Sequence, residues 1–331
     1  MAGAVRLVLS VLALALAAGA AADDGMLDAD ARATLSAIVR VQARALPGAH
    51  TAATLGEQRD GSGVLVREGY VLTIGYLVVE ADSIEVTGAD GRTAPATLAA
   101  YDHATGFGLL KLATPLAGRP LPLGNSAALV ERDAAMVAAY GGRDALNLVY
   151  VVSRRPFSGG WEYQLDNAIY TYPAVQGWSG SALIGPHGEL LGIGSLVVPD
   201  AGGIGAPSPG NLFVPIDLLK PILDELIAHG RAPGPSRPWM GLNTEEVRGR
   251  LYVARVSPEG PAERAGLRRG DLVLGVGDEE VDTLADFYRK VWARGSAGVE
   301  IPLRVLHGMQ VRELPVRTID RLDYFRKKPT Y

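Results

Sequence analysis

The stretch Gly177-Trp178-Ser179-Gly180-Ser181 carries the clearest chemistry in this sequence. A serine between small residues in a tight turn presents its hydroxyl as a nucleophile, because glycine lets the backbone bend sharply. In such a turn the N–H groups of Gly177 and Ser179 could converge on a carbonyl oxygen as an oxyanion hole. The pattern predicts an acyl-transfer site, provided that a base lies nearby to take the serine proton.

Composition limits the alternatives. The 331 residues, 48% hydrophobic and 21% charged, predict a globular protein of about two domains. A net charge of −4 gives no reason to expect nucleic acid as a partner. The absence of cysteine excludes disulfides, a thiol nucleophile and cysteine-ligated metals, and the five histidines show no metal-ligand spacing. We therefore predict no metal and no cofactor.

The first residues have the composition of an export signal. Arg6 precedes an apolar stretch from Leu7 to Ala17, and small residues end at Ala22. We predict a signal peptide over residues 1–22, cleavage near Ala22, and a periplasmic or otherwise exported protein. A retained membrane anchor is the alternative.

The elements that must position Ser179 are short strands separated by turn signals, which favour β-barrels or a sandwich. Two halves of this kind, each of about ninety residues, predict two barrels side by side. A helix is expected over 214–229, with an apolar stripe, a kink at Pro221 and a stop at Gly230. The strands expected in the two halves are 64–66, 70–73, 83–86, 97–100, 109–112, 135–138, 148–152, 183–184 and 190–198.

A linker of three prolines and a glycine follows, within residues 231–238, and separates off a smaller α+β domain at 239–320. Its expected strands are 251–256, 272–276, 301–305 and 311–316, and its expected helix is 284–293. Thr283 and Asp286 form a variant of the capping box for that helix. The basic tail 321–331 is expected to be loosely held. The predicted fold class is mainly β: a double barrel followed by this small domain.

In order and spacing these pieces resemble the HtrA/DegP family, in which an exported chymotrypsin/trypsin-like domain precedes a PDZ domain. In residues 23–230, the protease-like part, the resemblance rests on Gly61-Ser62-Gly63-Val64, Tyr70-Val71-Leu72-Thr73, the serine turn and Phe213-Val214-Pro215-Ile216. In the last domain it rests on the motif from Gly260 to Leu267 followed by Gly270-Asp271. The resemblance implies that Ser179 is the nucleophile.

The triad implied by the resemblance is incomplete. The family has a histidine where this chain has Tyr76, and an aspartate where it has Gly106. A neutral tyrosine is a poor base, and loss of a triad member costs on the order of 10⁴ in rate. We therefore predict a remnant nucleophile and inefficient hydrolysis.

Three further residues bear on whether another group replaces the missing imidazole. His103 could swing toward Ser179 as an unconventional base, although a solvated loop histidine is the more ordinary interpretation. His187 is interpreted as a structural residue at a hairpin tip. Trp178 is expected to fill the hollow or to close the substrate cleft.

In the PDZ-like domain, Trp239-Met240-Gly241-Leu242 resembles the loop whose N–H groups receive a peptide's C-terminal carboxylate. The resulting prediction is an HtrA-like pseudoprotease that binds peptides or unfolded segments in envelope protein quality control. The alternatives are an active serine endopeptidase and a structural subunit of a larger assembly. The resemblance alone implies a homo-oligomer, a trimer.

Overall fold

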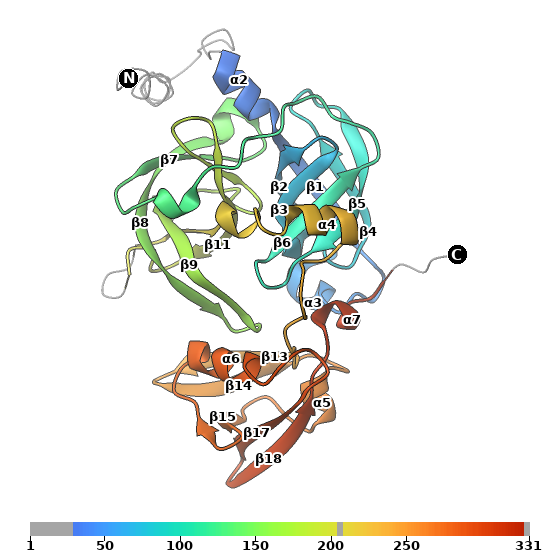
Figure 1. Cartoon of the computed structure of the whole chain (residues 1–331), viewed down its shortest axis with the longest axis vertical. Helices are drawn as coiled ribbons and strands as arrows, with labels where there is room; N and C mark the ends of the chain where they lie inside the picture. The colour runs from blue at the N-terminus through green and yellow to red at the C-terminus, as the bar shows by residue number, and fades with distance from the viewer. Residues whose placement is uncertain (1–28, 204–207, 328–331) are drawn as a thin grey trace. The chain divides into compact units, whose positions relative to one another are not determined.

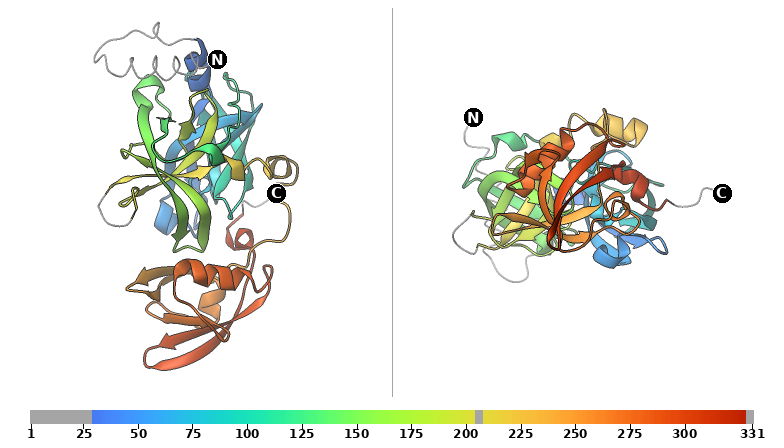
Figure 2. Two further views of the ribbon diagram at one scale, coloured as in Figure 1. Left: turned by 60° about the vertical axis from the view of Figure 1, so that its left-hand side comes forward. Right: turned by 90° about the horizontal axis from the view of Figure 1, so that it is seen from below.

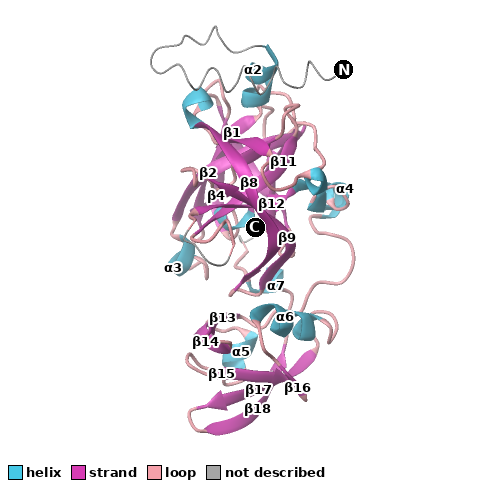
Figure 3. Ribbon diagram, turned by 90° about the vertical axis from the view of Figure 1, so that its left-hand side faces the viewer, coloured by secondary structure: helices cyan, strands magenta, loops and turns pink. Residues whose placement is uncertain are grey.

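A computed structural model describes residues 29–203 and 208–327. The predicted export signal lies outside these ranges. Within them, no helix is both long enough and apolar enough to cross a bilayer. The described residues form two compact units, the first from residues 29–155 and 167–232 without the gap at 204–207, and the second from residues 156–166 and 233–327. Strands dominate in both units (Figure 3).

The first unit begins with a closed six-stranded barrel, drawn in blue to cyan in Figure 1. Its strands are joined in the order β1-β2-β3-β6-β5-β4. A short helix ends at Ser36, and the first strand of the barrel begins at Ile38. The elements are α2 (Ala29–Ser36), β1 (Ile38–Ala45), α3 (Ala52–Leu55), β2 (Gln58–Arg67), β3 (Tyr70–Ile74), the 3₁₀ turn η2 (Gly75–Leu77), β4 (Ala81–Thr87), β5 (Thr93–Tyr101) and β6 (Phe107–Leu112).

A second closed barrel follows, in the order β10-β11-β12-β9-β8-β7, which confirms the predicted double barrel. In its core, Ala135 and Val137 of β7 pack with Val149 and Val151 of the next strand, β8. The elements are η3 (Ser126–Ala128), β7 (Ala134–Ala138), η4 (Gly142–Ala145), β8 (Leu146–Gly159), β9 (Tyr163–Tyr172), β10 (Ala182–Ile184), β11 (Leu190–Val198), β12 (Gly210–Pro215), η5 (Ile216–Leu218) and α4 (Leu223–His229).

The second unit is built on an antiparallel sheet in the order β13-β14-β15-β17-β18, with β16 on β15 (Figure 2). The apolar stripe of α6 (Leu284–Trp292) is buried through Leu284, Phe287, Tyr288 and Val291, and the Thr283 hydroxyl caps the helix by accepting from the N–H of Asp286 at 3.1 Å. The other elements are β13 (Leu242–Val247), β14 (Arg250–Val256), α5 (Pro261–Arg264), β15 (Leu272–Val276), β16 (Glu279–Glu280), β17 (Glu300–His307), β18 (Gln310–Arg317) and α7 (Arg321–Tyr324).

Two sequence predictions are wrong. The helix expected over 214–229 begins only at Leu223, because Val214 and Pro215 pair with Ile193 and Gly192 as the end of β12. The tail is ordered through Lys327 rather than loosely held. Asp320 caps α7 by accepting from the N–H of Leu322, and Tyr324 packs on Trp239 with 4.6 Å between ring centroids.

Candidate functional site

Backbone bonds to both barrels hold the serine turn. The N–H of Ser62, on β2, donates to the carbonyl of Ser179 at 2.8 Å. The N–H of Gly180 donates to the carbonyl of Gly194, on β11, at 2.9 Å. The turn closes on itself through the N–H of Ser181, which donates to Trp178 O at 3.1 Å. The serine is therefore presented where the two barrels of the first unit meet.

Two glycines make this close approach feasible. Gly180 has a φ of +72°, and a Cβ there would lie 2.0 Å from the carbonyl oxygen of Ser62. A Cβ on Gly194 would lie 2.0 Å from the carbonyl oxygen of Trp178. Both distances are far inside van der Waals contact, so larger residues would force the turn away from the strands that hold it.

The Ser179 hydroxyl is hydrogen-bonded to the hydroxyl of Tyr76, which lies on η2 directly after β3. The Tyr76 hydroxyl also donates to the carbonyl of Ser195 at 2.8 Å. A phenol has one proton, and a carbonyl can only accept. Tyr76 therefore donates a hydrogen bond to the Ser195 carbonyl and accepts one from the Ser179 hydroxyl.

Burial raises the pKa of Tyr76 to about 12, and its hydrogen bond to Ser179 offsets only part of that effect. At neutral pH about one molecule in 10⁵ would carry a phenolate. The group beside the serine is thus a neutral phenol, which cannot take up the serine proton efficiently.

Gly106 lies beside this pair at the start of β6 with a φ of +81°. Its carbonyl accepts from the N–H of Gly75, the residue before Tyr76, at 2.7 Å. The structure therefore brings together the three positions that the sequence singled out, Ser179, Tyr76 and Gly106. The third has no side chain with which to orient or stabilise a base.

The nearby acid and imidazole are engaged elsewhere. The Asp102 carboxylate accepts from the N–H and hydroxyl of Thr105, at 2.9 and 2.6 Å. The Nδ1 atom of His103 lies 3.3 Å from the hydroxyl of Tyr101. His187 lies in the β10–β11 connection, where its N–H donates to Glu189 at 2.8 Å. Within the described ranges, the Ser179 hydroxyl is bonded to neither histidine.

The N–H groups expected to form an oxyanion hole are free of protein acceptors. No acceptor in residues 29–203 or 208–327 takes the N–H of Gly177 or of Ser179. Gly177 is exposed with a φ of +69°, and Trp178 beside it is half-exposed. These two N–H groups are the donors that the predicted oxyanion hole would use.

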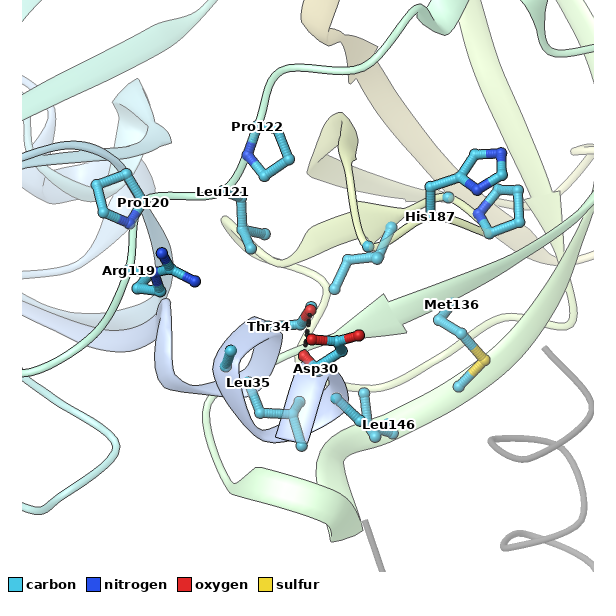
Figure 4. Close-up of a pocket in the computed structure, with 16 residues that line it drawn as sticks. Asp30, Thr34, Leu35, Arg119, Pro120, Leu121, Pro122, Met136, Leu146 and His187 are labelled. Atoms are coloured by element: carbon cyan, nitrogen blue, oxygen red, sulfur yellow. Dashed lines mark hydrogen bonds between the residues drawn. The ribbon is translucent and has the colours of Figure 1, made fainter. Parts of the chain in front are cut away.

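A pocket of about 740 Å³ lies elsewhere in the first unit, between α2, residues 119–122 and residues 184–188 (Figure 4). Leucine and proline side chains line much of it, with Asp30, Arg119 and His187 among them. Neither Ser179 nor Tyr76 lines it, so it is separate from the serine turn. In the part of the chain that the structure describes, no group of three histidine, aspartate or glutamate residues could hold a metal ion.

The loop before β13 in the second unit binds a carboxylate. The N–H groups of Met240, Gly241 and Leu242 donate to the carboxylate of Glu162 at 2.8, 2.7 and 2.9 Å. Trp239, expected in the same role, is not among the donors, because its N–H donates to Ile319 O at 3.0 Å.

Sequence reasoning missed two of these participants. Ser195 contributes a backbone carbonyl, which no side-chain pattern reveals. Glu162 follows Gly159-Gly160-Trp161, an unremarkable turn sequence, and it meets the loop only through contacts about 80 residues away in the chain. Two glycines before a tryptophan were the sole local signal.

The similarity to known proteins covers both units. A trypsin-like peptidase domain matches residues 61–193, and a PDZ domain matches residues 238–318. HhoA of Synechocystis sp., named as a serine protease, is 30% identical over 283 residues, which span 78% of this chain and 70% of that protein. The periplasmic serine endoprotease DegP of Salmonella typhimurium is 28% identical over 68% of this chain and 50% of its own length.

Solved structures show the same fold. The HtrA-type protease AlgW with a decapeptide superposes with a TM-score of 0.53 at 22% identity, covering 91% of this chain and all of that one. A serine endoprotease from Yersinia pestis gives a TM-score of 0.51 at 24% identity, covering 88% of this chain and 96% of that one. The chain therefore belongs to the HtrA/DegP family of trypsin-like serine proteases with a C-terminal PDZ domain.

Proposed function

We propose that this chain is an exported HtrA-type pseudoprotease that binds peptides or unfolded protein segments and hydrolyses them poorly. In this proposal Tyr76 and Gly106 stand where the family's triad has its histidine and aspartate. The observation that carries it is the hydrogen bond from the Ser179 hydroxyl to the buried, neutral Tyr76 phenol. A serine without a base is a weak nucleophile.

Binding is assigned to the PDZ domain, whose loop already holds a carboxylate through three N–H groups. Extended peptides bind to such domains by adding a strand at a sheet edge. The periplasm is proposed from the names of relatives such as the periplasmic endoprotease DegP, and cleavage near Ala22 would release the mature protein. Envelope protein quality control is the process in which such an exported binder would act.

One observation favours a second candidate, an active serine endopeptidase. Ser179 is in place and the N–H groups of Gly177 and Ser179 have no acceptor among the described residues, so the oxyanion donors are available. An oxyanion hole and substrate binding alone retain about 10³–10⁴ of acceleration over water. That level would be slow turnover rather than efficient proteolysis.

The two candidates separate in one experiment. The protein, its Ser179→Ala variant and the doubly substituted Tyr76→His, Gly106→Asp variant are incubated with a fluorophosphonate probe and with casein. We expect wild type to label and cleave no more than Ser179→Ala does, while the double substitution raises Ser179-dependent labelling at least about tenfold. Serine-dependent cleavage by wild type at a rate similar to that of the double variant would refute the pseudoprotease.

The trimer implied by the family resemblance is also a proposal. Sedimentation equilibrium of the mature protein tests it, because a trimer has three times the mass of the monomer. A monomer at micromolar concentration would contradict it.

A further inference from the structure

The carboxylate in the loop before β13 belongs to a strained and buried residue. Glu162 is only 2% exposed and has a φ of 60°, a backbone conformation that non-glycine residues rarely adopt. Such strain persists only where the surroundings hold the residue in place. Here the three N–H groups of residues 240–242 supply the holding contacts.

The segment before Glu162 also pairs with the sheet edge. β13 is the outer strand of its sheet, so one side of it has no strand partner within that sheet. The N–H of Thr244 on that strand donates to the carbonyl of Gly160 at 2.8 Å. Gly160 lies two residues before Glu162, and Thr244 lies two residues after Leu242. Moving two residues back from Glu162 and two residues on from Leu242 thus reaches a second contacting pair. This is the register of an antiparallel strand added at β13 with its end in the loop.

The helix that lines the other side of the groove holds the same segment. The Tyr288 hydroxyl on α6 donates to the carbonyl of Gly159 at 2.7 Å and accepts from the N–H of Glu162 at 3.0 Å. Arg321 of α7 donates to the carbonyl of Trp161 at 3.3 Å. Loop, strand and two helices of the second unit therefore all contact residues 159–162.

An external peptide would need the same donors. A backbone N–H supplies one hydrogen, so the N–H groups of Met240, Gly241 and Leu242 cannot bond fully to two carboxylates at once. Thr244 likewise has one N–H for strand addition. Occupation by Glu162 and occupation by a peptide C-terminus are mutually exclusive.

We infer that residues 159–162 are a tethered ligand of the PDZ groove, which an incoming peptide with a free C-terminal carboxylate must displace. The segment imitates a peptide end, with the Glu162 side chain in place of the α-carboxylate. The inference rests on the proposed peptide binding. Beyond that proposal, it says that residues 159–162 occupy the PDZ groove when no peptide is bound.

The first test measures peptide affinity. Fluorescein-labelled decapeptides with randomised last four residues and a free C-terminus are titrated by anisotropy into wild type, Glu162→Gln and Glu162→Gly. Glycine adopts the φ of residue 162 without strain, so the second substitution removes the carboxylate and spares the backbone. We expect Glu162→Gly to bind at least about tenfold more tightly than wild type, because the competing side chain has been removed. Glu162→Gln keeps a neutral oxygen acceptor in the loop and should bind no more tightly than wild type.

Matched controls isolate the cause. Asp166→Asn removes one exposed negative charge from β9, four residues after Glu162, and should leave the affinity at the wild-type value. The same peptides with amidated C-termini should bind none of the four proteins measurably. Equal affinity of all four proteins for the free-carboxylate peptides would overturn the inference.

A second readout separates this inference from the proposed function. Amide hydrogen exchange at residues 240–244 reports whether Glu162 occupies the loop, whether or not any peptide binds. We expect these amides to exchange at least about tenfold faster in Glu162→Gly than in wild type and Asp166→Asn. If none of the proteins binds peptides but this difference in exchange is seen, the proposed peptide binding is wrong and the inference that residues 159–162 occupy the groove is retained. Equal exchange rates would show that Glu162 does not occupy the loop.

Discussion

At the scale of single residues, the serine turn depends on how one phenol uses its hydrogen bonds. The Tyr76 hydroxyl donates to Ser195, accepts from Ser179 and also makes a hydrogen bond with the Trp178 side chain, so its polar contacts hold neighbours in place. Histidine in that position would accept the serine proton and carry a charge, whereas a phenol with a pKa of about 12 does neither at neutral pH. The position thus supports the turn rather than activating its hydroxyl.

This role predicts the effect of Tyr76→Phe. The substitution leaves the Ser195 carbonyl without its phenolic donor and Ser179 without an acceptor, so the free energy of unfolding should fall by about 1–3 kcal/mol. Urea denaturation measures it, and Tyr150→Phe, at a residue 46% exposed, should change it by less than about 0.5 kcal/mol. Fluorophosphonate labelling should stay at the Ser179→Ala level. A change in Ser179-dependent labelling would instead place Tyr76 in the chemistry.

At the scale of elements, the serine turn is hydrogen-bonded to both β2 and β11, and its close approach to β2 requires glycine at position 180. A Cβ there would meet Ser62 O at 2.0 Å and Thr73 Oγ1 at 2.5 Å, at a φ of +72°. Backbone strain and overpacking each cost about 1–3 kcal/mol. We expect Gly180→Ala to lower the free energy of unfolding by about 2–5 kcal/mol in urea denaturation.

Gly142 supplies the matched control for that prediction. Its φ is +66°, close to that of Gly180, but a Cβ on it would have no atom within 4 Å. Gly142→Ala should therefore cost only the backbone strain, about 1 kcal/mol. If the two variants lose the same free energy of unfolding, the close approach of Gly180 to Ser62 does not account for the effect of Gly180→Ala.

The local sequence pattern predicts a strand or helix well where that element buries a single face, because its apolar residues then recur at the period of the element. The strand expected at 272–276 and the helix expected from Leu284 lie where the pattern puts them, because alternation and the i, i+3, i+4 stripe reflect one buried face. The helix expected over 214–229 fails at Val214 and Pro215, since pairing with β11 decides their conformation. The same limit hides Glu162, whose partners lie far along the chain.

At the scale of the whole molecule, the tethered occupant makes the PDZ groove sensitive to pH. Burial raises the pKa of Glu162 to about 7, and the N–H groups of the loop together with the Arg321 charge offset only part of that shift. Its ordinary value is 4.5. The other groups facing it are Arg321 on α7 and Tyr288 on α6, and neither residue type changes charge between pH 4.5 and 7.

A pKa that is higher in the bound segment than in the released one means that protons favour the bound segment. The extra stability of the occupied groove is fully present below pH 4.5 and is lost as the pH rises through 7. A peptide α-carboxylate, with an ordinary pKa of about 3.5, stays ionised over most of this range. External peptides should therefore compete better as the pH rises.

We expect the affinity of wild type for the free-carboxylate decapeptides to increase roughly tenfold to thirtyfold between pH 5.5 and pH 8.0, measured by anisotropy at constant ionic strength. Glu162→Gln cannot titrate at this position and should bind with an affinity that changes by less than about threefold over the same range. Asp166→Asn should follow wild type, because its own carboxyl is exposed and outside the groove. Parallel pH profiles for wild type and Glu162→Gln would show that the Glu162 carboxyl is not what the peptide displaces.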